Sequence, residues 1–225
     1  MKHQAINKLK HDKDTYEFCR AHTENENPDI PILSKMCSST LDDIEKAVID
    51  LFSSYDCNRV TMKLVAIEAN VSLQTIYKYF GNKQMLICTI VNRVLERLSK
   101  RMIDSLYGID SIKERLRKTL WVCFDFVDNY PKVIMVISTA VPASHYRSIA
   151  IYENKELIEA FLALLADGQS SGILNDRVPL YVLHDMFMGF ISRLGFMHII
   201  RGKSTPINEQ FNALFDILWR GLAKH

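Results

Sequence analysis

Apolar residues recur every three or four positions across residues 40–222, and this spacing limits the fold more than any other feature of the chain. Leu41, Ile44 and Val48 are a short example, and a longer run begins at Leu86. Such spacing places apolar side chains on one face of an α-helix. We find no stretch with the two-residue alternation of a half-exposed strand. Eight glycines and six prolines are also few for an all-β chain, which is rich in turns. The sequence therefore predicts an all-α fold of about nine helices.

Residues that begin or end helices give the approximate bounds of these elements. Thr40, Thr61, Ser72 and Ser111 stand where side chains cap helix N-termini. Proline opens three of the later helices, because its fixed backbone angle suits the first turn. The expected helices are 40–52, 61–69, 72–80, 83–107, 112–129, 131–139, a long segment from Pro142 that Gly168 and Gly172 end, 180–201 and 207–221.

The composition is that of a globular protein able to bury a core without disulfides or metal. The 225 residues are 48% hydrophobic and carry a net charge of +2. Five scattered cysteines show neither a CxxC pair nor zinc-type spacing with histidine, so we expect reduced thiols, no metal and no cofactor. The polar N-terminus does not resemble a secretory signal, and the most apolar stretch, 178–200, contains four ionisable residues. These features predict a cytoplasmic protein with no membrane partner.

The most informative window is residues 61–83, TMKLVAIEANVSLQTIYKYFGNK. Two short helices with N-caps lie three residues apart, which is the spacing of a helix-turn-helix motif. Asn70, between them, tolerates a left-handed backbone conformation. The side chains expected in the core are Val65, Ala66, Ala69, Val71, Ile76 and Phe80. In such motifs the second helix enters the major groove of DNA.

This window resembles the DNA-binding motif of TetR-family transcriptional regulators. The resemblance is carried by Thr61, Ala66, Ala69, Val71, Ser72, Thr75, Ile76, Tyr77, Tyr79, Phe80 and Lys83. The chain departs from the family pattern at Asn70, where glycine is usual, and at Gln74, where a small residue is common. The specific match covers 40–86, and the helical layout extends it to 40–222. The resemblance implies a DNA-binding domain at 40–86 and a helical effector-binding and dimerisation domain at 87–225.

Residues 1–39 form a third region, an N-terminal extension that is first basic and then acidic, with two prolines. We interpret it as a flexible arm on a linker, because chain termini are commonly poorly ordered. The alternative is an arm that adds phosphate or groove contacts, as in some DNA-binding domains.

Charge and residue chemistry agree with a DNA-binding role. Residues 59–101 carry eight basic and two acidic side chains, although a solvated helix face is the alternative for those from Arg93 onward. Thr61, Ser72 and Lys83 are expected to hold phosphates. Gln74 suits adenine and Lys78 suits guanine. Lys63 is a further predicted DNA-binding residue. Leu73 and Thr75 are expected to contact thymine methyl groups, and Tyr77 and Tyr79 are expected to contact the DNA backbone.

The larger domain shows no catalytic motif, so the sequence predicts a protein that is not an enzyme. GxSxG, HExxH and P-loop patterns are absent, and the histidines are not clustered. Its large side chains form either an ordinary core or the wall of a cavity for an effector. The residues we expect to bind such a ligand are Trp121, Phe124, Tyr130, Tyr146, Phe161, His184 and Phe187.

The last two long helices are apolar over wide arcs, and the resemblance implies that they pair with a twofold mate. Gly189 and Gly195 would permit close helix approach. The expected dimer residues are Gly189, Phe190, Leu194, Phe211, Phe215 and Leu218. We therefore expect a homodimeric repressor that binds a palindromic double-stranded DNA operator and is released by a small apolar effector, with fatty acyl-type molecules as one guess. The alternative is a helical ligand-binding or interaction protein with a degenerate DNA-binding domain.

Overall fold

The structure is a computed structural model that describes residues 35–106, 108–141, 155–202 and 205–225. These residues contain nine α-helices and one 3-10 helix, and they form no strand beyond one isolated bridge. The prediction of an all-α fold with about nine helices is confirmed. Most of the N-terminal extension and the ligand-binding candidate Tyr146 lie outside the described residues.

The helices form two compact units, which divide the long helix α6 between Glu96 and Arg97. The first unit comprises residues 35–96 and 130–141, and the second comprises the described residues from 97 to 129 and from 155 onward. The sequence placed a domain boundary after residue 86 and assigned everything beyond it to the larger domain. In the structure, the packing of the first unit extends ten residues further along α6 and also includes α8.

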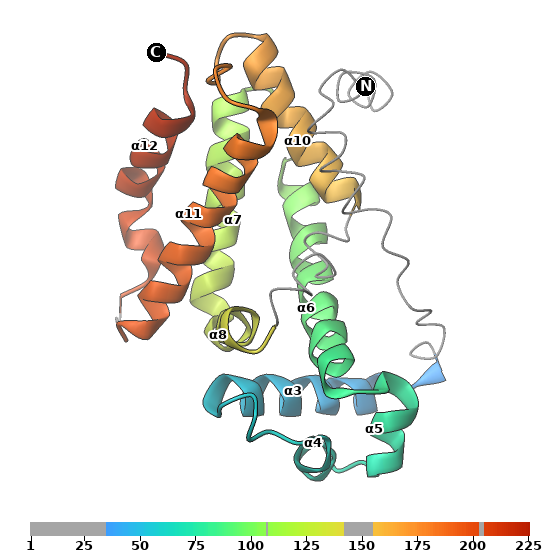
Figure 1. The fold of residues 1–225 in the computed structure, drawn as a ribbon. Coiled ribbons are helices and arrows are strands. Elements are labelled where there is room, and N and C mark those ends of the chain that lie inside the picture. The colour runs from blue at the N-terminus through green and yellow to red at the C-terminus, as the bar shows by residue number, and fades with distance from the viewer. Residues whose placement is uncertain (1–34, 107, 142–154, 203–204) are drawn as a thin grey trace. The chain divides into compact units, whose positions relative to one another are not determined.

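The first unit contains α3 (Ser38–Ser54), α4 (Met62–Glu68), α5 (Leu73–Phe80), the start of α6 (Lys83–Leu106) and α8 (Pro131–Thr139). Helix α3 lies across α4 and packs against α8, and α4 packs against α5 (Figure 1). The three- and four-residue spacing of the sequence places one stripe from each helix in a shared core. Its buried members include Ile44, Val48, Phe52, Val65, Ile76, Phe80, Leu86, Ile90 and Val136.

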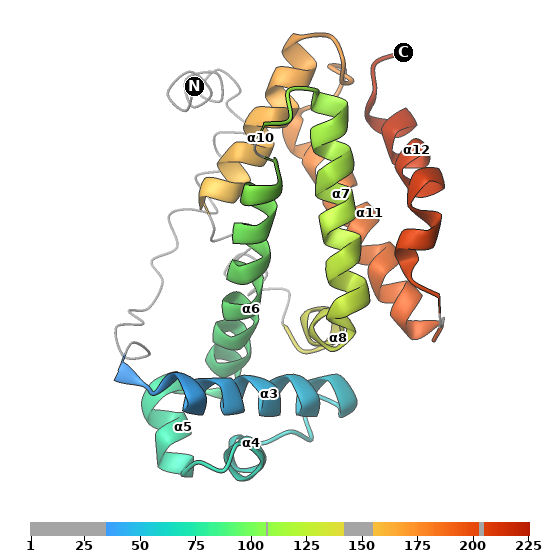
Figure 2. The ribbon, with the colours of Figure 1, turned by 180° about the vertical axis from the view of Figure 1, so that it is seen from behind.

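The second unit contains the end of α6, α7 (Ile112–Asn129), α10 (Lys155–Ser170), α11 (Leu180–Ile200), the 3-10 helix η3 (Ile207–Gln210) and α12 (Phe211–Leu222). Helix α7 contacts α10, α11 and α12, and Figure 2 shows it running beside α11 and α12. The core of the second unit includes Leu116, Leu120, Phe124, Leu162, Leu165, Leu183, Phe187 and Phe215.

One close helix approach inside the second unit requires a glycine. A Cβ atom at Gly195 on α11 would lie 2.8 Å from Cγ2 of Val127 on α7, closer than side chains pack. A Cβ atom at Gly189, six positions earlier on α11, would meet nothing within 4 Å. Both glycines were expected to permit close helix approach. Gly195 permits the approach of α11 to α7 within one chain, whereas Gly189 faces open space.

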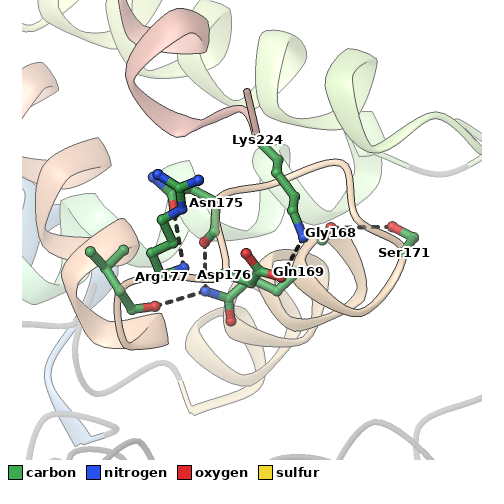
Figure 3. Close-up of polar contacts among 8 residues, drawn as sticks. Gly168, Gln169, Ser171, Asn175, Asp176, Arg177 and Lys224 are labelled. Carbon is green, nitrogen blue, oxygen red and sulfur yellow. Dashed lines mark hydrogen bonds and ion pairs between the residues drawn. The ribbon is translucent and has the colours of Figure 1, made fainter.

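The loop between α10 and α11 is joined to the C-terminal residues (Figure 3). The Gln169 side-chain amide donates a hydrogen bond of 2.8 Å to the main-chain oxygen of Asn175. The backbone N–H of Asn175 in turn donates to the carbonyl of Leu222, also at 2.8 Å. The ammonium of Lys224 lies 2.6 Å from the carboxylate of Asp176. These bonds fix the C-terminal end of α12 against the loop.

Two predicted helix starts differ from the structure. Helix α3 begins at Ser38 instead of Thr40, and Cys37 precedes it without a side-chain capping bond. The N-cap assigned to Thr40 is therefore wrong. The helix expected at 207–221 begins with a 3-10 turn, because Asp128 of α7 accepts the backbone N–H of Ile207 at 2.9 Å and holds this turn in place.

Candidate DNA-binding surface

Helix α4 is fixed by a side-chain cap and by three buried residues. The hydroxyl of Thr61 accepts the backbone N–H of Leu64 at 3.1 Å, as the sequence predicted for an N-cap. Val65, Ala66 and Ala69 are buried. Lys63, in the first turn of the helix, is exposed. The first turn of α4 therefore presents a positive side chain and an N-terminal helix end to solvent, both of which attract phosphate.

The turn between α4 and α5 has the left-handed residue that the sequence predicted. Asn70 has a φ of +52°. Its N–H donates to Ile67 at 3.1 Å, and the N–H of Val71 donates to Ala66 at 2.9 Å. This pair of bonds is a Schellman motif, which satisfies the last carbonyl groups of α4. Asparagine thus replaces the family's usual glycine while the turn is kept.

Helix α5 is capped by Ser72, whose hydroxyl accepts the backbone N–H of Thr75 at 3.0 Å. The two hydroxyl groups also lie 2.8 Å apart, so that of Thr75 is engaged at this end of the helix. The expected contact of Thr75 with a thymine methyl group would therefore use its own methyl group.

The faces of α5 separate the core from the side chains available to DNA. Ile76 and Phe80 are buried, whereas Thr75 and Tyr79 are half-buried. Four of the predicted DNA-binding side chains on α5 are exposed, namely Leu73, Gln74, Tyr77 and Lys78. Gln74 and Lys78 are four positions apart, so they are neighbours on one helix face. This exposed face presents hydrogen-bond donors and acceptors of the kind that read base edges in the major groove.

The basic stripe of the sequence is divided by the fold. Arg93 on α6 forms ion pairs with Asp42 and Glu45 on α3, each at 2.6 Å. Further along α6, in the second unit, Arg101 pairs with Asp125 at 2.7 Å. These two arginines hold helices together. The exposed cations nearest the motif are Arg59, Lys63 and Lys78, so the cationic surface is smaller than the stripe of eight basic residues suggested.

Lys83, which was expected to hold a phosphate, has a different environment. Its ammonium group donates to the main-chain oxygens of Cys57 at 2.8 Å and Val60 at 3.2 Å. Both acceptors belong to the loop that joins α3 and α4. The sequence alone does not indicate these bonds, since the partners are 26 and 23 positions away.

Comparison with known proteins identifies the motif. The N-terminal domain profile of the bacterial regulatory proteins of the tetR family matches residues 44–88. Residues 44–88 of this chain therefore form a DNA-binding domain of the TetR type. Members of the tetR family are transcriptional regulators rather than enzymes. A curated relative, the uncharacterized HTH-type transcriptional regulator YxbF of Bacillus subtilis, is 25% identical over 95 residues. That match covers 42% of this chain and only a quarter of YxbF.

Solved structures of TetR-family proteins share this fold. A TetR-family regulator from Marinobacter aquaeolei superposes with a TM-score of 0.69 at 18% identity, covering 83% of this chain and 97% of that protein. The regulator FadR of Bacillus subtilis, in complex with stearoyl-CoA, superposes with a TM-score of 0.66 at 18% identity, covering 80% of this chain and 98% of FadR. At such low identities the likeness establishes the fold of this chain and nothing finer.

The predicted ligand-binding residues lie in different surroundings. The ring of Phe161 on α10 lies 4.9 Å from that of Phe187 and 5.9 Å from that of His184, both on α11. Phe187 and His184 are buried, as is Phe124 on α7. Trp121 instead lines an open groove beside Phe211, where the ammonium of Lys118 lies 4.4 Å from its ring. Tyr130 is exposed in the first unit.

The predicted dimer residues also divide into two groups. Phe211, Phe215 and Leu218 are at most 9% exposed, and the guanidinium of Arg117 lies over both phenylalanine rings. All three are buried within this chain, and the rings of Phe211 and Phe215 face Arg117 of α7. Phe190 and Leu194 are half-buried, and Gly189 is exposed. The exposed large apolar side chains of α11 and α12 include Met186, at 43%, and Ile217, at 61%, neither of which was among the predicted dimer residues.

The described residues hold no cluster of three or more histidine, cysteine or acidic side chains that could bind a metal ion. Within the same ranges, no helix has the length and apolar character needed to cross a membrane.

Proposed function

We propose that this chain binds a palindromic operator as a homodimer, represses transcription from it, and is released by a small apolar effector. The observation that carries the DNA-binding part is the outward face of α5, where Gln74 and Lys78 are exposed neighbours while Ile76 and Phe80 anchor the helix. A glutamine suits adenine and a lysine suits guanine in the major groove. Thr61, Lys63 and Ser72 are proposed to hold the flanking phosphates.

We place the dimer surface on the outer faces of α11 and α12. The methyl carbon of Met186 lies 3.4 Å from the Cβ position of Gly221, so the two helices contact each other there. Met186, Gly189 and Ile217 are all exposed on this pair of helices. An apolar surface of this kind favours association with a second copy. A dimer presents two recognition helices about 34–36 Å apart, which matches successive major grooves of a palindrome.

We propose that the effector has a long apolar chain. The supporting features are the buried aromatic cluster of Phe161, His184 and Phe187 and the fold likeness to a FadR protein whose structure contains stearoyl-CoA. His184 is the polar member of this cluster, and its Nδ1 lies 3.1 Å from the carboxylate of Asp185. Ligand binding and operator binding would be reciprocally coupled through two states of the dimer.

The DNA-binding proposal is tested by selecting bound fragments from random duplex DNA. We expect a palindromic consensus whose two halves are separated by one or more helical turns. Weak, sequence-blind binding would contradict the proposal and favour a helical protein with a degenerate motif.

The effector proposal is tested on the selected operator. Stearoyl-CoA and stearate are expected to release the protein, whereas free CoA, which lacks the chain, is expected to have no effect. If acyl chains of several lengths never change operator affinity, an acyl effector is excluded.

A further inference from the structure

The open groove beside Trp121 is not used by the proposals for operator, dimer or effector. It has a volume of about 560 Å³, which is within the range of small-molecule sites, and it lies wholly in the second unit. We call it the α7–α12 groove. Its lining residues come from the segment before α7, from α7 and from the start of α12, namely Ile109, Glu114, Arg117, Lys118, Trp121 and Phe211. None of them belongs to the buried aromatic cluster of α10 and α11 or to the exposed apolar surface proposed for the dimer.

Two cations of α7 are held against aromatic rings in this groove. The ammonium group of Lys118 lies 4.4 Å from the centre of the Trp121 ring. The guanidinium carbon of Arg117 lies 5.5 Å from the centre of the Phe211 ring. A terminal nitrogen of the same guanidinium donates to the side-chain oxygen of Asn212 at 2.6 Å, which fixes its position further. Because cation–π contacts attract a charge to a ring face, the groove combines positive charge with flat apolar surface.

The charges of the α7–α12 groove are complementary to an anion. Within the part of the chain that the structure describes, neither Arg117 nor Lys118 forms an ion pair. Glu114 also lines the groove, so two positive side chains stand against one negative. An ammonium group carries three N–H donors, and contact with one ring face leaves donors for an anionic oxygen. The groove therefore favours an anionic ligand over a neutral or cationic one.

We propose that the α7–α12 groove binds a small organic anion with a flat aromatic body. The body packs against Ile109, Trp121 and Phe211, which form the apolar part of the lining. The carboxylate or sulfonate group of the ligand binds the ammonium of Lys118, and the guanidinium of Arg117 adds a second positive charge. This ligand differs from the proposed effector, which has a long apolar chain and a site on α10 and α11. The inference depends on neither operator binding nor effector release, so its failure leaves those proposals standing.

The experiment titrates the full chain with anilinonaphthalene sulfonate, an aromatic anion whose fluorescence rises in apolar surroundings. We expect Lys118→Met to weaken binding of this probe about tenfold, because one charge-assisted bond is lost. Lys113→Met is the matched control, since Lys113 lies over the Trp219 ring at 5.1 Å but does not line the groove, and it should leave binding unchanged. Phenylnaphthylamine, which has the same rings without the sulfonate, should bind wild type and Lys118→Met equally. Equal sulfonate binding by wild type and Lys118→Met, or a parallel loss of both probes, would overturn the inference.

A measurement on the wild-type chain covers the case in which Lys118→Met does not fold. Lysine acylation read by mass spectrometry is compared with and without anilinonaphthalene sulfonate. We expect the probe to protect Lys118 and to leave Lys113 as reactive as before. Equal acylation of Lys118 in the two samples would refute binding in the α7–α12 groove.

Discussion

The guanidinium of Arg93 on α6 lies 2.6 Å from the carboxylate of Glu45 on α3, and a second nitrogen lies at the same distance from Asp42. The Arg93–Glu45 ion pair joins α6 to α3 within the first unit, and its two residues are 48 positions apart in the sequence. Glu45 and Arg93 are largely shielded from solvent, whereas Asp42 is exposed. Arg93 therefore bridges the start of α3 to α6, the helix that follows the DNA-binding motif.

Replacing Arg93 with methionine should lower the free energy of unfolding by about 1 kcal/mol, as expected for part-exposed ion pairs. The difference should shrink at high salt, which screens the pairs. Urea unfolding followed by circular dichroism measures both effects. Lys100→Met, at an exposed position of the same helix, is the control and should change stability little. Equal stability of the two variants at low salt would mean that the Arg93 pairs contribute nothing.

The contact between Gly195 and Val127 predicts a difference between two alanine variants of α11. Both glycines lie within the helix, so alanine at either site should gain similar helix propensity. Only at Gly195 would the new methyl group meet a neighbour, at 2.8 Å. Gly195→Ala should therefore be about 1–3 kcal/mol less stable than Gly189→Ala in thermal or urea unfolding. Matching stabilities would show that α7 and α11 do not approach each other so closely.

The exposed position of Ile217 predicts a monomeric variant. Ile217→Lys would place a charge in the proposed dimer surface, which should weaken association by a factor of about ten or more without unfolding α12. Light scattering coupled to size exclusion measures the mass directly. Ile103→Lys makes the same change at an exposed isoleucine of α6 and should leave the mass unchanged. A dimer that survives Ile217→Lys would locate the interface elsewhere.

Two cysteines should differ strongly in their reaction with thiol reagents. The Cys37 thiol is exposed, and hydrogen bonds with the Ser39 side chain and then with the backbones of Ser39 and Thr40 lower its pKa. Burial of the Cys123 sulfur raises the pKa of that thiol to about 12. Since the thiolate reacts, alkylation of Cys37 should begin at a lower pH than that of an ordinary thiol, whereas the half-buried Cys123 should react only at a much higher pH. Peptide mass spectrometry of alkylated protein distinguishes the sites, and labelling of Cys123 at as low a pH as Cys37 would contradict the prediction.

Local sequence was sufficient for the helix-turn-helix because its signals lie within a few residues. The caps at Thr61 and Ser72 and the left-handed Asn70 each follow from the residue itself and its immediate neighbours. Contacts between distant positions could not be found in this way. The bonds of Lys83 to the α3–α4 loop and the approach of Gly195 to Val127 depend on how helices pack.

The dimer residues show the limit of periodicity most clearly. Helix α12 is apolar over a wide arc, and the sequence does not indicate which part of that arc meets α7. The structure assigns Phe211, Phe215 and Leu218 to the interior and leaves Ile217 outside. The prediction from the apolar arc and the resemblance therefore included three large side chains of α12 that the chain uses for its own core.

The central claim, that the exposed face of α5 reads DNA bases, is tested most directly by comparing selected sequences for wild type, Gln74→Ala and Lys78→Ala. The account predicts that each variant loses base preference at one symmetric pair of operator positions and about 1–3 kcal/mol of affinity, while its fold is retained. Identical consensus sequences and affinities for all three proteins would contradict it.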